Sequence, residues 1–272
     1  MPEGDTILWA ATRMRPVLVG AVPDAIETPH PRHELDRWPA RLAGRMVERV
    51  DTHGKNLLLV FEGGLVLHSH LRMTGAWDVR PVGGRWIRSP RRAWLALRHG
   101  DAEVLQFDGP VLELMTEARA RFDQRLAGLG PDVLAASFDL PRFLARLRAD
   151  DPARPIADAL IDQRIVAGIG NIWKAEGCWE AAIDPWRPVR EVSDEEAGAL
   201  IDGVRPRMLE SGRRGPRFLR ARVYGAPGCP VRGVVPPSDR RGRVRRTAGP
   251  TGARGARVET RRGADVPGRE LV

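Results

Sequence analysis

Residues Asp162–Trp179 read DQRIVAGIGNIWKAEGCW, and this segment sets the organisation of the second half of the chain. Its apolar residues recur at helical spacing, but Gly168 and Gly170 interrupt that pattern just before Asn171. A Gly-x-Gly-Asn turn that opens a new helix exposes backbone N–H groups, which can hold a phosphate. Lys174 follows one turn into that helix. The alternative is an ordinary joint between two helices that binds nothing.

Helical patterns extend on both sides of this turn. They are separated by short loops that contain proline or glycine, and they read FDQRLAGLGPDVL, DLPRFLARLRAD, IADALIDQRIVAGIGNIWKAEGCWEAAID and SDEEAGALIDGVRPRMLESG. We therefore predict an all-α domain over residues 121–222.

The first 120 residues have a different texture. Ile7, Leu8, Ala11 and Met14 lie at helical spacing, with Asp5 and Thr6 able to cap the start and Pro16 expected to end or bend the helix. Alternating or short apolar runs then predict strands, some of them in hairpins. These runs are Arg45–Asp51, Asn56–Glu62, Leu65–His70, Ala93–Arg98 and Glu103–Asp108. The fold class is α+β, with a two-layer β-sandwich behind a leading helix.

Composition limits the classes of function. The chain has 272 residues, 42% of them hydrophobic, and its formal net charge is +9, so it is long and apolar enough to fold and it favours a polyanion such as nucleic acid. Only Lys55 and Lys174 of its 44 basic residues are lysines. No run approaches the roughly 18 apolar residues of a membrane span, and no signal peptide is apparent. We expect a cytoplasmic protein that does not bind membranes.

The last fifty residues differ again. Val231–Val272 contains no aromatic residue, and its eleven arginines against four acidic residues contribute +7 of the +9 net charge. Such a segment buries too little apolar surface to offset its ordering entropy. We expect residues 223–272 to form an irregular, disordered arginine-rich tail, so that the evidence for a nucleic-acid enzyme depends on the motifs before it.

The N-terminus Met1-Pro2-Glu3-Gly4 carries a possible reactive group. Removal of Met1 would leave a secondary amine on Pro2, and an α-amino group titrates near pH 7.7–8, so a large fraction is nucleophilic at neutral pH. Such an amine can attack an aldehyde or aminal carbon to form a Schiff base, with Glu3 as general acid or base. The alternative is a Met-Pro start with no chemical role, which is common.

Five ordered motifs now coincide, and together they resemble one family. They are MPEGDT at the start, HGKNLLLVF around Lys55, HLRMTGAW (His70–Trp77), QRIVAGIGNIWKAE, and RVYGAPG (Arg222–Gly228). The chain resembles the bacterial endonuclease VIII and formamidopyrimidine-DNA glycosylase family from Pro2 to about Pro230. The PEGDT start is closer to the endonuclease VIII branch, whose preference is for oxidised pyrimidines.

The resemblance implies a base-excision-repair DNA glycosylase with lyase activity that acts on damaged double-stranded DNA as a monomer. It makes Pro2 the nucleophile at C1′ of the damaged nucleotide, Glu3 the acid or base, and Lys55 a cation at the sugar and its phosphate. Met73 would be the wedge that fills the gap left by a flipped base. The implied DNA-binding residues of the helix–two-turn–helix are Gly168, Gly170, Asn171 and Lys174.

One family feature is missing from the chain as written. Members usually end in a zinc finger with two C-x₂-C pairs, whereas this tail has only Cys229. We therefore predict no metal and no cofactor, and a weakened damage-specific activity. Reading the tail one nucleotide out of frame would permit cysteines at positions 231, 234, 253 and 256, so we suspect a frameshift just after Pro230. Resequencing the gene through this junction tests that hypothesis.

Two other functions remain open from the sequence. A non-enzymatic DNA-binding protein could use the helix–two-turn–helix alone, and a catalytically dead relative could bind nucleic acid through its basic tail. The first needs no free amine on Pro2, and the second predicts a steep salt dependence without lesion preference.

Overall fold

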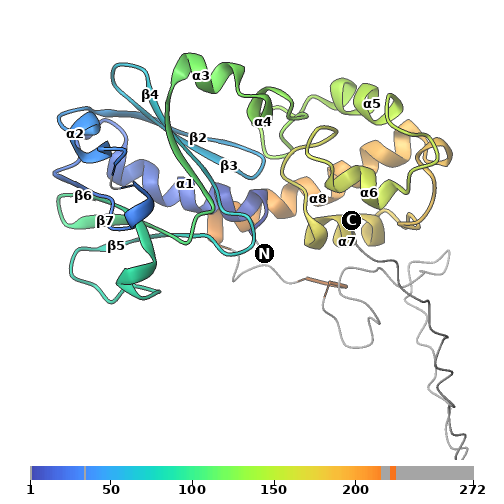
Figure 1. The fold of residues 1–272 in the computed structure, drawn as a ribbon. Coiled ribbons are helices and arrows are strands. Elements are labelled where there is room, and N and C mark those ends of the chain that lie inside the picture. Colours follow the sequence, from blue (N-terminus) through green and yellow to red (C-terminus); the bar gives the residue numbers. More distant parts are fainter. Residues whose placement is uncertain (1, 34, 216–220, 225–272) are drawn as a thin grey trace, which may run out of the picture.

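The structure is a computed structural model that describes residues 2–33, 35–215 and 221–224. A β-sandwich and a helical domain lie side by side (Figure 1). Helix α1 (Gly4–Leu18) belongs to the first domain and packs along α8 (Asp194–Arg214) of the second. The predicted α+β order of a leading helix, a sandwich and an all-α domain is confirmed. The predicted tail over residues 223–272 lies almost entirely outside the described residues.

Two four-stranded antiparallel sheets form the sandwich. One has the order β1-β6-β7-β5 and the other β2-β3-β4-β8. The strand bounds are β1 Ala25–Glu27, β2 Val47–His53, β3 Asn56–Phe61, β4 Leu65–His70, β5 Ala76–Pro81, β6 Ala93–His99, β7 Ala102–Phe107 and β8 Val111–Thr116. Five of these match the predicted runs within two residues at either end.

Strands β1, β5 and β8 were not predicted from the sequence. Each lies at the edge of its sheet, where a strand can be short or polar. Strand β1 has only three residues, and β5 contains Asp78, Arg80 and Pro81, which weaken any strand pattern.

Helix α1 covers the sandwich core with Ile7, Ala11, Met14 and Leu18, all essentially buried. The predicted cap was wrong, because the helix begins at Gly4 with Glu3 as its N-cap residue. Pro16 was expected to end or bend the helix, and it does not end it, since the helix continues to Leu18. A proline this close to the end removes only one backbone hydrogen bond, and burial of Leu18 offsets that loss.

The helical domain packs around the buried indole of Trp173. Its helices, together with the short helix α2 in the sandwich, are α2 Trp38–Leu42, α3 Glu117–Phe122, α4 Gln124–Ala127, α5 Leu140–Arg148, α6 Ile156–Ile161, α7 Asn171–Glu180 and α8. Helix α6 ends earlier than predicted, because the Asp162 carboxylate accepts the Arg164 N–H at 3.0 Å and starts the turn there. Within the described ranges, no helix is long and apolar enough to cross a bilayer.

A fully buried carboxylate, Glu176 on α7, anchors the segment that follows α8. It accepts the backbone N–H groups of Arg222, Val223 and Tyr224 at 2.9 to 3.0 Å and the guanidinium of Arg207 at 2.9 Å. Burial favours the neutral acid, but these donors outweigh it and hold the pKa of Glu176 below its ordinary value.

We expect Glu176→Gln to lower the free energy of unfolding at pH 7 by roughly 2–3 kcal/mol, because it leaves buried donors unpaired. Since the pKa of the folded state lies below the ordinary 4.5, this stabilisation is present above pH 4.5 and is lost as the pH falls through the folded-state pKa. Urea unfolding at pH 7 and pH 4 measures both effects. Glu180→Gln, a more exposed acid on the same helix, is the control and should cost less than about 1 kcal/mol; equal losses in the two variants would contradict this account.

Candidate active site

The Glu3 carboxylate lies at the N-terminus of helix α7. It is 1% exposed and accepts the N–H groups of Gly170 at 2.9 Å, Ile172 at 2.8 Å and Trp173 at 3.3 Å. These are the unpaired donors of the first helical turn, and the helix dipole also favours negative charge here. The anion at the glycine turn is therefore a side chain of the chain itself, from a residue 167 positions away.

Burial raises the pKa of Glu3, and only part of that rise is reversed by the Ile172 N–H and the nearby charge of Lys55. A carboxyl group with a raised pKa is protonated in a larger fraction of molecules near neutral pH. Glu3 is thereby suited to donate a proton to a substrate oxygen and to take it back.

Four glycines let the two domains approach each other at this point. A Cβ on Gly170 would lie 2.4 Å from Cδ of Glu3, and one on Gly54 would lie 2.8 Å from Cβ of Ala167. Gly168 has a φ of +106°, and its carbonyl accepts the Gly4 N–H at 2.9 Å. The glycines of MPEG, HGK and AGIG are therefore contact points between three segments, in addition to forming turns.

We expect Gly4→Ala to lower activity on the order of a hundredfold while the protein stays folded. The new Cβ would lie 2.9 Å from Cα of Gly168, a backbone atom, so the segment that carries Pro2 and Glu3 must shift. Displacements of about 1 Å at reacting groups have effects of this size. The rate of single-turnover cleavage of a duplex with an abasic site measures the loss. Gly198→Ala is the control, because its Cβ would make only an ordinary contact, 3.8 Å from Cδ2 of Leu140. Wild-type activity in Gly4→Ala would show that the close approach is unimportant.

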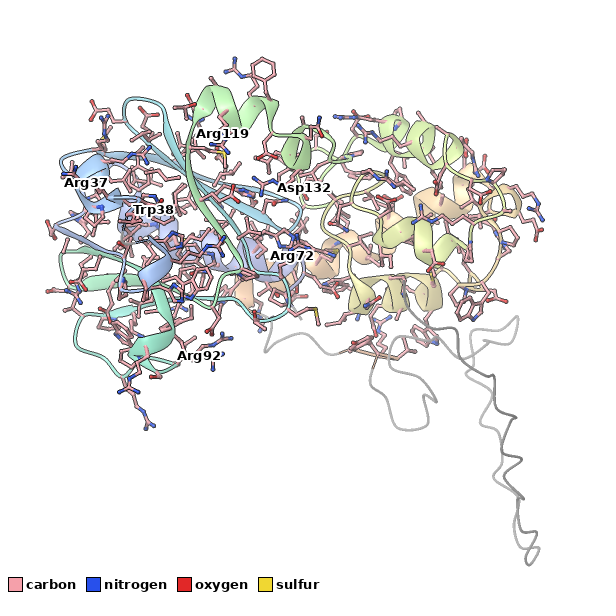
Figure 2. The ribbon with its side chains drawn as sticks, viewed as in Figure 1. Arg37, Trp38, Arg72, Arg92, Arg119 and Asp132 are labelled. Atoms are coloured by element: carbon pink, nitrogen blue, oxygen red, sulfur yellow. The ribbon has the colours of Figure 1, made fainter. Side chains whose placement is uncertain are left out.

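Lys55 lies in the two-residue turn between β2 and β3, next to Gly54. Burial lowers the pKa of Lys55, and the charge of Glu3 opposes that change. The turn is tied to the helical domain by His53, whose Nε2 is 2.9 Å from the Gly130 carbonyl oxygen, and by Asp132, which accepts the Gly54 N–H. Asp132 is labelled at the junction of the two domains in Figure 2. These contacts between the turn and the helical domain thus bring Lys55 near Glu3.

A cavity of about 880 Å³ opens beside Pro2. Its lining comes from both domains and includes Trp9, Met73, Trp77 and Ile172. Met73 is 67% exposed on the turn between β4 and β5, although large apolar side chains are normally covered. The predicted nucleophile and the predicted wedge therefore share one cavity whose walls are largely aromatic and aliphatic.

The remaining predicted site residues lie in the glycine turn and in the first turn of helix α7, which that turn opens. Asn171 is the first residue of α7, and its Oδ1 accepts a hydrogen bond from Nζ of Lys174 at 3.1 Å. The N–H groups of Gly168 and Gly170 donate to Gln163 and Glu3. The side chains of Asn171 and Lys174 are thus the groups at this turn best able to reach an external anion, and phosphate binding here stays a prediction.

Two residues near the site were not assigned a site role from the sequence. Asp5 is buried inside α1 and accepts the hydroxyl of Ser211 on α8 at 2.5 Å, which links the domains; burial raises the pKa of Asp5. His70 ends β4, and burial with the nearby Arg72 charge lowers its pKa to about 4, so its imidazole is neutral at pH 7. His70 stood inside the HLRMTGAW motif, which was the available signal.

The family's zinc ligands do not fit this chain. The sequence has two cysteines, fewer than a four-cysteine site needs, and Cys178 is fully buried in the helical core. Among the described residues, no group of three or more His, Cys, Asp or Glu side chains could hold a metal. Cys229 and the suspected finger positions lie outside the described residues.

The β-sandwich, the helix–two-turn–helix and the cavity between them define a two-domain class of proteins. Residues 1–128 match the formamidopyrimidine-DNA glycosylase N-terminal domain, and residues 129–217 match the helix–two-turn–helix domain of the same enzymes. The chain belongs to the formamidopyrimidine-DNA glycosylase family, which includes the proteins named endonuclease 8.

Relatives of both names are similar to this chain. It is 40% identical over 218 residues to a probable endonuclease 8 2 of Streptomyces coelicolor, which covers 79% of this chain and 76% of the relative. It is 34% identical to the DNA-(apurinic or apyrimidinic site) lyase Nei2 of Mycolicibacterium smegmatis, with 71% and 72% covered. Formamidopyrimidine-DNA glycosylase of Lactococcus lactis, solved bound to DNA with an AP site, shares the fold with a TM-score of 0.69 at 23% identity, covering 82% of this chain and 88% of that one.

Proposed function

We propose that this protein is a base-excision-repair DNA glycosylase with AP lyase activity, acting on oxidised bases, pyrimidines in particular, in double-stranded DNA. The observation that carries the proposal is the site itself. Pro2 borders the cavity, and the carboxylate of the next residue is fixed by three backbone N–H groups. The relatives named endonuclease 8 and DNA-(apurinic or apyrimidinic site) lyase support the same activity.

In the proposed reaction, the neutral amine of Pro2 attacks C1′ of the damaged nucleotide, and the bond from C1′ to the base breaks. The base leaves with the electron pair of that bond and takes up the proton that the amine loses. Glu3 donates a proton to the ring oxygen, the sugar opens, and an iminium forms between Pro2 and C1′. Loss of a proton from C2′ then expels the 3′ phosphate. Water hydrolyses the iminium and returns the free amine.

The other predicted site residues serve binding in this proposal. The ammonium of Lys55 places positive charge near the sugar and its phosphate, while Asn171 and Lys174 hold a neighbouring phosphate. Met73 enters the stack where the damaged base has left, and the cavity beside Pro2 receives that base. One chain supplies all of these groups, so we propose a monomer.

Borohydride reduction tests the proposal, because it converts the iminium into a stable covalent bond between protein and DNA. The protein is incubated with duplexes that carry an abasic site, an oxidised pyrimidine, or neither. We expect trapping with the first two and peptide mapping that places the link on Pro2. Absence of trapping with both lesions, combined with tight DNA binding, would favour a non-enzymatic DNA-binding protein.

A further inference from the structure

The segment between β5 and β6 carries a concentration of positive charge beside the candidate site. Residues Gly84–Arg92 read GRWIRSPRR, with four arginines and no acidic residue. We call this segment the arginine loop. None of the residues discussed so far comes from it, and the motifs that identify the family do not include it.

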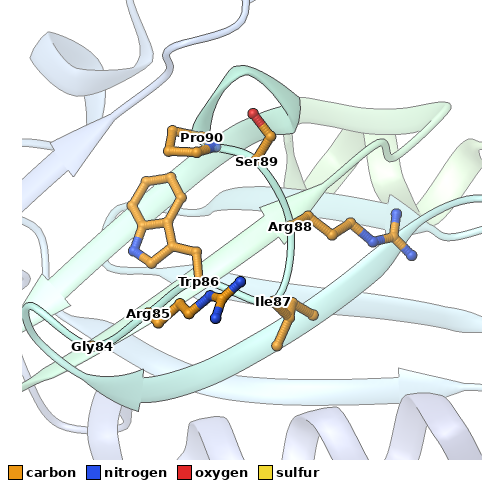
Figure 3. Close-up of a pocket in the computed structure, with 7 residues that line it drawn as sticks. All are labelled: Gly84, Arg85, Trp86, Ile87, Arg88, Ser89 and Pro90. Carbon is orange, nitrogen blue, oxygen red and sulfur yellow. The ribbon is translucent and has the colours of Figure 1, made fainter.

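The loop is fixed to the sheet beneath it. The indole N–H of Trp86 donates to the Glu103 carboxylate at 2.7 Å, and its ring meets the Phe107 ring edge-on with centroids 5.8 Å apart. Figure 3 shows Arg88 extending away from the loop on the side opposite Trp86. The arginines are therefore presented from an anchored backbone.

Arg88 fastens the loop to the turn that carries Met73, and both Arg88 and Arg92 fasten it to Asp108, directly after β7. Arg88 donates to the Thr74 carbonyl oxygen at 2.5 Å and pairs with Asp108, while Nε of Arg92 donates to the same Asp108 at 2.9 Å. Ile87 and Arg88 also border the cavity that Pro2 and Met73 line. The loop therefore forms one rim of that cavity.

Two arginines of the loop are left for other partners. Arg85 and Arg91 are exposed, and in the described part of the chain neither side chain has a hydrogen bond, ion pair or ring contact. By contrast, Arg88 and Arg92 both form ion pairs with the carboxylate of Asp108. The loop thus combines internally paired cations that hold it in position with unpaired cations that point to solvent.

We propose that the arginine loop is a DNA-binding surface in which Arg85 and Arg91 contact backbone phosphates beside the lesion and Arg88 holds the loop against the wedge turn. The inference rests on the proposed function for the position of the DNA. Duplex DNA with a sugar at Pro2 and Met73 in its stack must pass close to this rim, and it carries a negative charge about every 1.7 Å along its axis. Arginine suits such phosphates because its fork of N–H donors binds two oxygens.

The salt dependence of binding tests the proposal. We would measure the affinity for a duplex with a stable abasic-site analogue at several salt concentrations, for the wild type and for Arg85→Ala/Arg91→Ala. Each lost phosphate contact reduces the slope of log K against log salt by about 0.9, so the double variant should lose about 1.8. Affinity near 0.1 M salt should fall roughly five- to tenfold.

Arg119→Ala/Arg121→Ala is the matched control, since it removes the same charge from exposed arginines on α3. Figure 2 shows Arg119 on the opposite side of the sandwich from Arg92. A wild-type slope in the loop variant, or an equal loss in the control, would overturn the proposal. Failure of borohydride trapping in the wild type would instead overturn the proposed function. The slope of log K against log salt would still decide whether the arginine loop binds DNA.

Arg88→Ala supplies a second measurement, because Arg88 is a positioning residue in this proposal. With 2-aminopurine beside the lesion, fluorescence at saturating protein reports unstacking by the wedge turn. We expect a smaller fluorescence increase with Arg88→Ala, a partial recovery with Arg88→Lys, and a smaller change of salt slope than in the double variant. Full unstacking in Arg88→Ala would refute the positioning role.

Discussion

A protein whose Pro2 nitrogen is blocked should lose covalent trapping on abasic DNA by at least about a thousandfold, the scale on which removal of a catalytic nucleophile acts. The nitrogen is blocked by adding the dipeptide Gly-Ser directly before Pro2, so that the protein without Met1 begins Gly-Ser-Pro2. The Pro2 nitrogen then becomes part of an amide, whose lone pair is delocalised into the carbonyl group and cannot attack C1′. Gel separation after borohydride reduction gives the trapped fraction, and mass spectrometry verifies the N-terminus.

The same residues added at the C-terminus are the control and should leave trapping unchanged. Binding to a duplex with an abasic-site analogue should persist in the blocked protein, since Lys55, Asn171 and the arginine loop are unaltered. Pro2→Gly separates the amine from the ring: it keeps a primary amine, so we expect reduced trapping but not its loss. Wild-type trapping by the extended protein would exclude Pro2 as the nucleophile.

Local sequence patterns predicted the helices and strands well where the side chains of an element are buried in the core. The β3–β4 hairpin was predicted because apolar runs flank Gly63-Gly64, and the structure pairs Phe61 with Leu65 across that turn. Strands β1, β5 and β8 were not predicted because edge strands need no continuous apolar pattern. Asp5 was assigned to a helix cap because acidic residues favour that position, but contact with Ser211, 206 positions away, determines its place.

The candidate site shows the same limit at longer range. The sequence identified Glu3 and the Gly168-Ile169-Gly170 turn separately, one as an acid and the other as a phosphate site. Only domain packing shows that the carboxylate occupies the helix N-terminus that the turn creates. The arginine loop was missed for a related reason, because net charge counts arginines without showing that four of them lie in one loop, of which Ile87 and Arg88 border the cavity.

Glu3→Gln should slow removal of a damaged base by about 10²- to 10⁴-fold, the range for loss of a general acid. The folded protein should tolerate the change at pH 7. Because the pKa of Glu3 is raised by folding, the carboxyl group contributes stability below its ordinary 4.5, and that contribution is lost as the pH rises through the folded-state pKa. The ionised carboxylate is therefore costly to bury at neutral pH. Replacing it with an amide removes that cost, and this gain offsets the weaker hydrogen bonds that the amide makes.

The pH profile distinguishes an acid from a merely structural carboxylate. Wild-type single-turnover rates should rise with pH as the Pro2 amine loses its proton and then fall as Glu3 loses its own. In Glu3→Gln the falling limb should disappear, because the remaining activity needs only the neutral amine. Glu180→Gln, which removes a partly exposed acid from α7, is the control and should keep the wild-type profile. A falling limb that persists in Glu3→Gln would assign the acid to another residue, and the buried Asp5 beside the same cavity would be the next to test.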